Sequence, residues 1–487
     1  MLFNSLEFVV FFTLVLAVIT LIKHRYFQHL FILLASYFFY YFSGTYFISI
    51  LIASTIIDYF LGKEIFRAET IKKKKLILTI SIIFNLGLLG FFKYTNFAIE
   101  QFNGRLQNFN VQQIPLLDLA LPVGISFYTF HSVGYLIDVY RGHILPSKSL
   151  RDYAIFVAFF PQLVAGPILR SKLFLPQLKE KFESSDKIRQ FVIENPNLKL
   201  GITLMAFGFL KKMFFADNIS QLPNEIFLNP IGLDSFTVIL GTIAFGIQIY
   251  CDFSGYSDIA IGAALILGIK IPKNFNKPFF ATSPTEFWRR WHISLSSWVR
   301  DYLYLPLVFN RRKSLTAVFL GMMFTFFLLG LWHGAGWNFI VFGVLHGIYV
   351  AIDTIIRMKF PSLTKLVFFK TKIGTIISIL FTQYLVFFAF IAFRIQDVDQ
   401  LSYSMQKFVL LDLQTNEVLA VILQNKVSVA LLFLFVILHI VSYKKSNLIE
   451  SISDLKLRYW TLFITLIIGA VLYLYDANPD DFIYFRF

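Results

Sequence analysis

The chain has 487 residues, of which 57% are hydrophobic and only 15% are charged, and its mean hydropathy is +0.67. Soluble domains carry about a quarter charged residues, so this composition excludes an ordinary soluble protein and indicates an integral membrane protein. The net charge of +15 does not indicate nucleic-acid binding, because Lys and Arg gather in short connections such as 72–75 and 311–313. That distribution is typical of cytoplasmic loops facing anionic lipid.

Apolar runs of membrane-spanning length recur along the whole chain. The clear runs lie near 8–22, 27–43, 46–62, 76–92, 200–215, 235–250, 315–332, 337–355, 373–394, 428–443 and 460–475. Runs at 116–137, 152–168 and 255–269 are interrupted by Pro, Gly or polar residues, so we expect re-entrant or tilted helices there. The sequence therefore predicts an all-α polytopic membrane helical bundle of about ten to twelve spans, forming a single domain over residues 1–487.

Charge and cysteine content set the expected orientation and exclude some kinds of site. The ends of the chain carry mainly acidic residues, so we expect both termini outside. The Lys- and Glu-rich segment 171–197 is an expected cytoplasmic loop, with an amphipathic helix on the membrane surface. The single cysteine, Cys251, excludes an internal disulfide and a cysteine-based metal cluster, and we expect no metal site.

His333 follows the apolar run 315–332 and stands directly before Gly334, Ala335 and Gly336. We expect a membrane helix to end or loosen at this imidazole. An ionisable side chain at membrane depth is a functional-site hypothesis by default. The competing interpretation is a structural histidine that is hydrogen-bonded to a neighbouring helix.

A second histidine, His292, lies in the basic and aromatic stretch EFWRRWHISLSSW. Its helical spacing predicts one shared helix face for Trp288, His292, Leu295 and Val299. Arg289 and Arg290 are expected to meet lipid headgroups or a ligand phosphate.

Two further polar sites interrupt apolar surroundings. Asp252, Tyr256 and Asp258 lie in a predicted polar break, and carboxylates at that depth need cationic or hydrogen-bonding partners. They form either a network that holds helices in register or the wall of a ligand passage. Gln162, between two prolines, either lines a passage or caps carbonyls that the kink releases.

Five motifs in order resemble the membrane-bound O-acyltransferase (MBOAT) family, and its bacterial alginate O-acetyltransferase branch in particular. They are PVGISFYTF (122–130), FFPQLVAGPILR (159–170), YCDFSGYSDIAIG (250–262), FWRRWHISLSSWVRDYLY (287–304) and LLGLWHGAGWNFIVFGVLHG (328–347). The opening MLFNSLEFVVFF also resembles this branch, so the resemblance covers nearly the whole chain. The branch that transfers D-alanine to teichoic acid is similar mainly in the central motifs.

The resemblance implies an integral-membrane acyltransferase with N-terminal spans at 1–115, a catalytic core at 116–355 and C-terminal spans at 356–487. It implies that His333 in LWHG is the catalytic histidine and that His292 in RWHISL is the second active-site histidine. The implied substrate is acetyl-CoA from the cytoplasm, with no permanently bound cofactor. The implied product is an acetylated exopolysaccharide such as alginate, made at a bacterial cell membrane with a periplasmic or extracellular partner O-acetyltransferase.

Histidine suits acyl transfer, because its pKa near 6.5 lets it take the proton of an acceptor hydroxyl at neutral pH. We therefore expect His333 to act as general base and His292 to orient the acceptor or stabilise the oxyanion. Expected substrate- or donor-binding residues are Trp288, Arg289, Arg290, Trp291, Ser296, Trp332, Asp252, Tyr256, Asp258 and Gln162. A multi-pass transporter or flippase of a polysaccharide-export system, a D-alanyl transferase and a non-catalytic scaffold are the alternatives.

Overall fold

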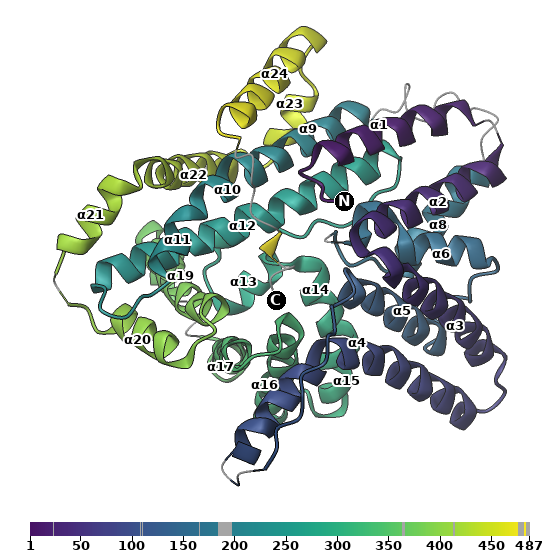
Figure 1. The fold of residues 1–487 in the computed structure, drawn as a ribbon, viewed down its shortest axis with the longest axis horizontal. Coiled ribbons are helices and arrows are strands. Elements are labelled where there is room, and N and C mark those ends of the chain that lie inside the picture. The colour runs from purple at the N-terminus through teal and green to yellow at the C-terminus, as the bar shows by residue number, and fades with distance from the viewer. Residues whose placement is uncertain are drawn as a thin grey trace. The chain divides into compact units, whose positions relative to one another are not determined.

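Every regular secondary-structure element among the described residues is a helix. The computed structural model describes residues 1–487 except 23, 108, 110, 165, 184–196, 363–365, 413, 476–481 and 484–487. No strand occurs among the residues it describes (Figure 1), which confirms the predicted all-α class. The chain forms two compact units: unit 1 is Met1–Met205 with Ser257–Pro272, and unit 2 is Ala206–Tyr256 with Lys273–Phe487. The single domain with boundaries at 115 and 355 stays a prediction.

Unit 1 contains the N-terminal helices and one end of α12. Its complete elements are α1 (Leu6–Leu21), α2 (Arg25–Gly44), η1 (Thr45–Phe47), α3 (Ile48–Arg67), α4 (Ile71–Gln107), α5 (Ile125–Tyr140), α6 (Leu150–Ala158), α7 (Phe160–Leu163) and α8 (Ser171–Glu183). The predicted interruption of 152–168 is confirmed, because α6 and α7 are separate short helices. Helix α8 begins the predicted loop 171–197, of which residues 184–196 lie outside the described part of the chain.

Helices α9 (Leu198–Phe209) and α12 (Ser235–Ile266) contribute residues to both units, and the remaining elements belong to unit 2. Those between α9 and α16 are η3 (Leu210–Ala216, a π-helix), α10 (Asp217–Ile219), α11 (Gln221–Ile226), η4 (Pro278–Phe280), α13 (Pro284–Arg290), α14 (Ile293–Val299), η5 (Arg300–Tyr304, a π-helix), α15 (Leu305–Val308) and η6 (Phe309–Arg311). The last are α16 (Leu315–His333), α17 (Trp337–Lys359), α18 (Val367–Lys370), α19 (Lys372–Arg394), α20 (Val398–Val409), α21 (Asn416–Gln424), α22 (Lys426–Lys444), α23 (Leu448–Ser453) and α24 (Leu457–Tyr473).

The described residues include seven helical segments that are long and apolar enough to cross a membrane. They are Tyr26–Arg67, Ile71–Gln107, Ser235–Ile266, Leu315–His333, Trp337–Lys359, Lys372–Arg394 and Lys426–Lys444. The first contains both α2 and α3, and the shorter apolar helices Leu6–Leu21 and Leu457–Tyr473 stand beside this set. A polytopic membrane bundle is therefore confirmed, while the total of ten to twelve spans stays a prediction.

Helix α12 corrects the predicted polar break. The run 255–269 was expected to be re-entrant or tilted, yet Ser235–Ile266 is one continuous 32-residue helix. Gly255 permits this, because a Cβ there would lie 2.8 Å from the carbonyl oxygen of Gly208 and 3.0 Å from the backbone nitrogen of Lys212. The small residue serves close helix packing, and no helix break is needed.

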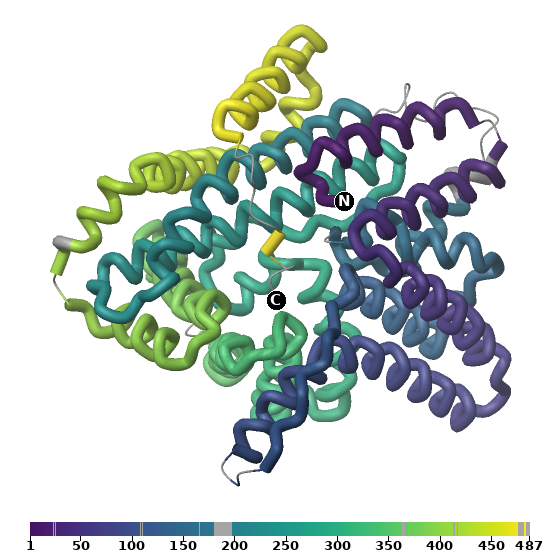
Figure 2. Tube along the Cα trace, in the orientation of Figure 1, coloured from purple at the N-terminus to yellow at the C-terminus, as the bar shows by residue number. Residues whose placement is uncertain are grey.

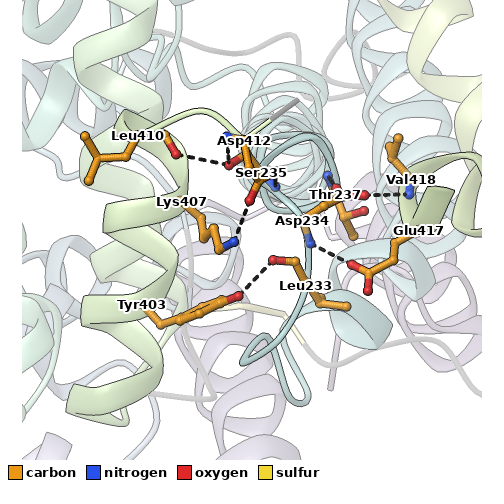
Figure 3. A network of polar contacts seen from close by, with 10 residues as sticks. All are labelled: Leu233, Asp234, Ser235, Thr237, Tyr403, Lys407, Leu410, Asp412, Glu417 and Val418. Atoms are coloured by element: carbon orange, nitrogen blue, oxygen red, sulfur yellow. Dashed lines mark hydrogen bonds and ion pairs between the residues drawn. The ribbon is translucent and has the colours of Figure 1, made fainter. Parts of the chain in front are cut away.

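A polar network fixes the first turn of α12 within unit 2 (Figure 3). The Asp234 carboxylate accepts hydrogen bonds from the backbone nitrogens of Thr237 at 2.6 Å and Val418 at 3.2 Å, so one side chain caps both α12 and α21. The Glu417 carboxylate accepts from the Asp234 backbone nitrogen at 2.6 Å. The Tyr403 hydroxyl donates to the Leu233 carbonyl at 2.9 Å, which ties α20 to the same turn.

Candidate active site

His333 is the last residue of α16, as the sequence predicts. Ser314 caps the other end of the helix by accepting from the Ala317 backbone nitrogen, and Gly334 follows His333 in an extended conformation. Helices α16 and α17 lie side by side (Figure 2). They approach so closely that a Cβ on Gly330 would lie 2.3 Å from the Phe339 carbonyl oxygen. This contact fixes the end of α16, and with it the position of the His333 side chain.

His292 is not part of one continuous helix, so the predicted shared face of Trp288, His292 and Leu295 is wrong. Helix α13 ends at Arg290, Trp291 is extended, and His292 has φ 42° and ψ 53° before α14 begins. A left-handed non-glycine residue costs about 1–3 kcal/mol and persists only where its surroundings impose it.

Two backbone hydrogen bonds from another segment of unit 2 hold this break. The Asn276 backbone nitrogen donates to the Arg290 carbonyl at 2.9 Å, and the Ile293 backbone nitrogen donates to the Asn274 carbonyl at 2.8 Å. The Ser294 hydroxyl also donates to the Asn274 side-chain oxygen at 2.6 Å. The segment 274–276 thus pairs with both sides of His292 and aims its side chain.

Trp332 lies between the two histidines. Its ring centroid is 6.2 Å from that of His292 and 4.9 Å from that of His333. Helix α12 supplies Phe253, centred 4.6 Å from His292, and α19 supplies Phe393, centred 5.1 Å from His333. The structure therefore brings together three residues that were expected in the site from the sequence, namely His292, Trp332 and His333.

Burial is nearly complete at this pair. His292 has no exposed surface and His333 is 4% exposed. Burial lowers the pKa of the His292 imidazole, because its charged form would lose solvation. A neutral imidazole carries one N–H donor and one acceptor nitrogen, and both are useful in transferring a group between oxygen and sulfur.

A cavity of about 410 Å³ lies among the helices that carry the histidines, although neither His292 nor His333 is in its lining, and we call it the arginine cavity. Its lining comes from α13, α14, η5, α16 and α17 and includes Trp288, Arg289, Ser296, Arg300, Thr325, Leu329, Val350 and Thr354. Ile293, another lining residue, directly follows His292. Leu329, also in the lining, precedes His333 by four residues and so lies one turn away on the same face of α16.

The tryptophans of this region differ in placement. Trp288 lines the arginine cavity, and its indole nitrogen donates to Nδ1 of His346 on α17 at 3.2 Å. Trp291 is buried and stacks on Phe287 at 5.4 Å, and it does not belong to the cavity lining. His346 is completely buried. Its hydrogen-bonding partner is 58 residues away in the sequence, so the residues next to His346 do not announce this contact.

The predicted polar ligands Arg289, Arg290 and Ser296 also have distinct settings. Arg289 is exposed and lines both the arginine cavity and a neighbouring cavity of about 400 Å³. Arg290 forms an ion pair with Glu286 at 2.7 Å and donates to the Asn276 carbonyl. The Ser296 hydroxyl donates to the Trp291 carbonyl at 3.1 Å.

Asp252 has a cationic partner, as its depth requires. Lys212 Nζ lies 2.7 Å from Asp252 and 2.8 Å from Asp217, and the Ile483 backbone nitrogen donates to Asp252 at 2.9 Å. Tyr256, one turn further along α12, stacks on Phe482 with centroids 4.3 Å apart. Sequence reasoning missed Lys212, although a lysine inside the apolar run 200–215 is itself a signal of a buried carboxylate nearby.

Gln162 and Asp258 belong to unit 1, whereas the histidine pair belongs to unit 2. The Gln162 amide donates to the Phe156 carbonyl at 2.6 Å, so it caps a group that the kink before α7 releases. Asp258 lies on α12 and is partly exposed.

An α-helical membrane protein with two buried histidines around one tryptophan has the features expected of an integral-membrane acyltransferase. The chain belongs to MBOAT, the membrane-bound O-acyltransferase family, whose model matches residues 142–395. It is a membrane-bound O-acyltransferase, and the predicted resemblance is confirmed.

Individual relatives support the same assignment. A protein of Azotobacter vinelandii named probable alginate O-acetylase AlgI is 39% identical over 362 residues, which cover 74% of this chain and 70% of the relative. The peptidoglycan O-acetyltransferase of Helicobacter pylori is 36% identical over 354 residues, covering 68% of this chain and 65% of the relative. The teichoic acid D-alanyltransferase of Streptococcus thermophilus is 31% identical over 254 residues, covering 49% and 58%. This chain is thus similar to proteins whose names give three different targets, which are alginate, peptidoglycan and teichoic acid.

Proposed function

We propose that this enzyme takes an acetyl group from cytoplasmic acetyl-CoA and delivers it for O-acetylation of a polysaccharide outside the cell, with alginate as the leading acceptor. The observation that carries this proposal is the packing of both His292 and His333 against Trp332, beside Ile293 and Leu329, which line the arginine cavity. The similarity to an alginate O-acetylase supports the choice of acceptor. A periplasmic or extracellular partner O-acetyltransferase would complete the modification.

Charge supports entry of the donor through the arginine cavity. Coenzyme A carries phosphates, and the cavity lining holds Arg289 and Arg300 with no carboxylate among its described residues. The cavity also includes Thr354 near the end of α17, whose last turn carries Arg357 and Lys359. Basic helix ends of this kind favour the cytoplasmic side.

The chemistry follows from the two imidazoles. His333 takes the proton of the acceptor hydroxyl while its oxygen attacks the thioester carbonyl of acetyl-CoA. The resulting oxyanion accepts a hydrogen bond from the N–H of neutral His292, and its collapse breaks the carbon–sulfur bond. The proton held by His333 passes to the departing thiolate. Trp332 and the surrounding phenylalanines exclude water that would otherwise hydrolyse the thioester.

Labelled-acetyl transfer from acetyl-CoA tests the proposal. Membranes carrying the parent chain or its His333→Ala variant are incubated with donor, candidate polysaccharide and candidate partner. We expect label on the partner or polysaccharide with the parent chain, and a fall of about 10²–10⁴-fold with the variant.

His439→Phe is the matched control. His439, on α22, is also a buried histidine, but its ring stacks on those of Phe280 and Phe435 and not on Trp332. It should transfer like the parent. Equal transfer by His333→Ala and the parent would contradict the assigned base. Label from a D-alanyl donor in place of acetyl-CoA would shift the function toward that of the teichoic acid relative.

A further inference from the structure

A second cavity of unit 2, about 390 Å³ in volume, has a different lining, and we call it the amide cavity. Its residues come from α11, α12, α19, α20 and the segment near the C-terminus, and they are Asn224, Phe227, Phe245, Gln248, Arg394, Ile395, Gln396, Asp397, Gln400 and Ile483. Four carboxamides thus share one small space with two phenyl rings.

The amide cavity is lined by the last turn of α19, away from the basic last turn of α17. Arg394 ends α19, which begins at Lys372. The Asn338 amide donates to the Ala392 carbonyl at 3.0 Å, so the end of α19 meets the start of α17. Helix α17 has its basic residues, Arg357 and Lys359, in its opposite last turn. The arginine cavity is therefore lined by Val350 and Thr354 in the second half of α17, whereas the amide cavity is lined by the end of α19, which meets the start of α17.

The buried side-chain oxygen of Gln248 indicates that the cavity binds a polar ligand. Its side chain is 7% exposed and lines the cavity, and its Oε1 is buried without a hydrogen-bond partner among the described residues. A buried carboxamide without a partner is costly, and such groups are normally satisfied by water or a ligand. Helix α12 holds Gln248 in place, because its first turn is fixed to α20 and α21 by the network of Figure 3.

Arg394 is held in a defined orientation beside Gln248. Its guanidinium donates to the Asn224 side-chain oxygen at 2.9 Å and lies 5.9 Å from the centre of the Phe245 ring. The exposed carboxylate of Asp397 balances its charge, so the described lining carries no net charge. This lining therefore lacks the excess positive charge of the arginine cavity.

The cavity is close to the histidine pair. Phe245, in its lining, is centred 6.5 Å from Phe393, and Phe393 is centred 5.1 Å from His333. Two aromatic rings therefore separate the amide cavity from the expected base. An acceptor hydroxyl that displaced the edge of these rings would reach His333 from the amide cavity.

We propose that the amide cavity binds the acceptor, and that the acceptor enters as a saccharide unit. Carboxamides, a guanidinium and a carboxylate together supply donors and acceptors, which match hydroxyl groups that both donate and accept. The phenyl rings of Phe227 and Phe245 supply apolar surface for the C–H face of a pyranose ring. This inference rests on the proposed acetyl transfer, and it adds the site and chemical class of the acceptor.

Saccharide binding to the purified full chain in lipid nanodiscs tests the inference without catalysis. The probes are a tetrasaccharide prepared from alginate and a tetrasaccharide prepared from peptidoglycan glycan strands. We expect at least one to bind the parent chain, and Gln248→Leu to raise its Kd about tenfold through lost hydrogen bonds. Gln383→Leu is the matched control, because Gln383 is equally buried at 8% but lies outside the cavity lining.

A second measurement covers the case in which Gln248→Leu fails to fold. Gln400, a partly exposed residue of the lining, is changed to cysteine in a Cys251→Ser background, and its reaction with a membrane-impermeant maleimide is timed. We expect saturating saccharide to slow this reaction at least fivefold. An unchanged rate, or equal weakening of binding by Gln383→Leu, overturns the assignment.

The acceptor can also be presented by a protein, and the same experiment separates that case. Protection of the Gln400→Cys thiol by a serine-containing partner segment, with no protection by either saccharide, overturns the saccharide assignment. Acetyl-CoA turnover is followed in parallel. Saccharide binding without acetyl-CoA turnover would contradict the proposed function alone. Turnover without saccharide binding or thiol protection would contradict the proposed acceptor site alone.

Discussion

The two cavities of unit 2 have nearly the same volume, about 410 and 390 Å³, yet their linings differ in charge. The described lining of the arginine cavity has Arg289 and Arg300 with no carboxylate, whereas in the amide cavity Asp397 balances Arg394. Volume therefore does not distinguish them, and electrostatics does. The difference in charge is what assigns the phosphate-bearing donor and the saccharide acceptor to separate cavities in the two proposals above.

The largest effect is expected from a change to the histidine pair, which both proposed substrates must reach. His292→Ala should lower kcat by about 10²–10³-fold, because the oxyanion loses a preorganised donor. The dissociation constants of donor and saccharide should stay within about twofold of the parent. Calorimetry checks the two dissociation constants, and labelled-acetyl transfer checks kcat. A parallel loss of both binding constants would show that His292 supports the fold and not the transition state.

The next largest effect is expected from removing the positive charge that distinguishes the arginine cavity from the amide cavity. Changing both Arg289 and Arg300 to Gln should raise the KM for acetyl-CoA about tenfold, because charge-assisted contacts to phosphate are lost. The salt dependence of this KM should flatten in the same variant. Initial rates at two ionic strengths provide the measurement. Arg394→Gln is the control, and it should leave the donor KM unchanged while weakening saccharide binding.

A smaller effect concerns the wall of the arginine cavity. His346→Phe removes the acceptor for the Trp288 indole, so the donor KM should rise about three- to fivefold with little change in kcat. His346→Asn should restore the parental KM, because its side-chain oxygen can replace Nδ1. A double variant with Trp288→Phe should be no worse than either single change. Additive effects would show that His346 acts on something other than Trp288.

Several features of this site could be predicted from local sequence. The end of α16 at His333 follows from a long apolar run that meets Gly334, Ala335 and Gly336. The release of carbonyls around Gln162 follows from its flanking prolines. In both cases the signal lies within a few residues of the feature.

Other features depend on contacts that are distant in sequence. The break at His292 has no glycine or proline to announce it, and it is imposed by hydrogen bonds from Asn274 and Asn276. Polar residues around Asp252 suggested a helix break, but Lys212 neutralises the carboxylate and lets α12 continue. Periodicity cannot reveal either case, because the deciding partner lies in another element.

The smallest expected effect tests whether the amide cavity depends on its anchoring network. Asp234→Asn keeps one of two helix-capping acceptors, whereas Asp234→Ala removes both, so thermal stability should fall in that order by about 0.5 and 1–2 kcal/mol. Saccharide Kd should rise about twofold in Asp234→Ala, because Gln248 loses its fixed position relative to α20. The acetyl-CoA constant should not change, since no residue of this network lines the arginine cavity. Equal changes in both constants would mean that the two cavities are not independent entrances but parts of one continuous passage.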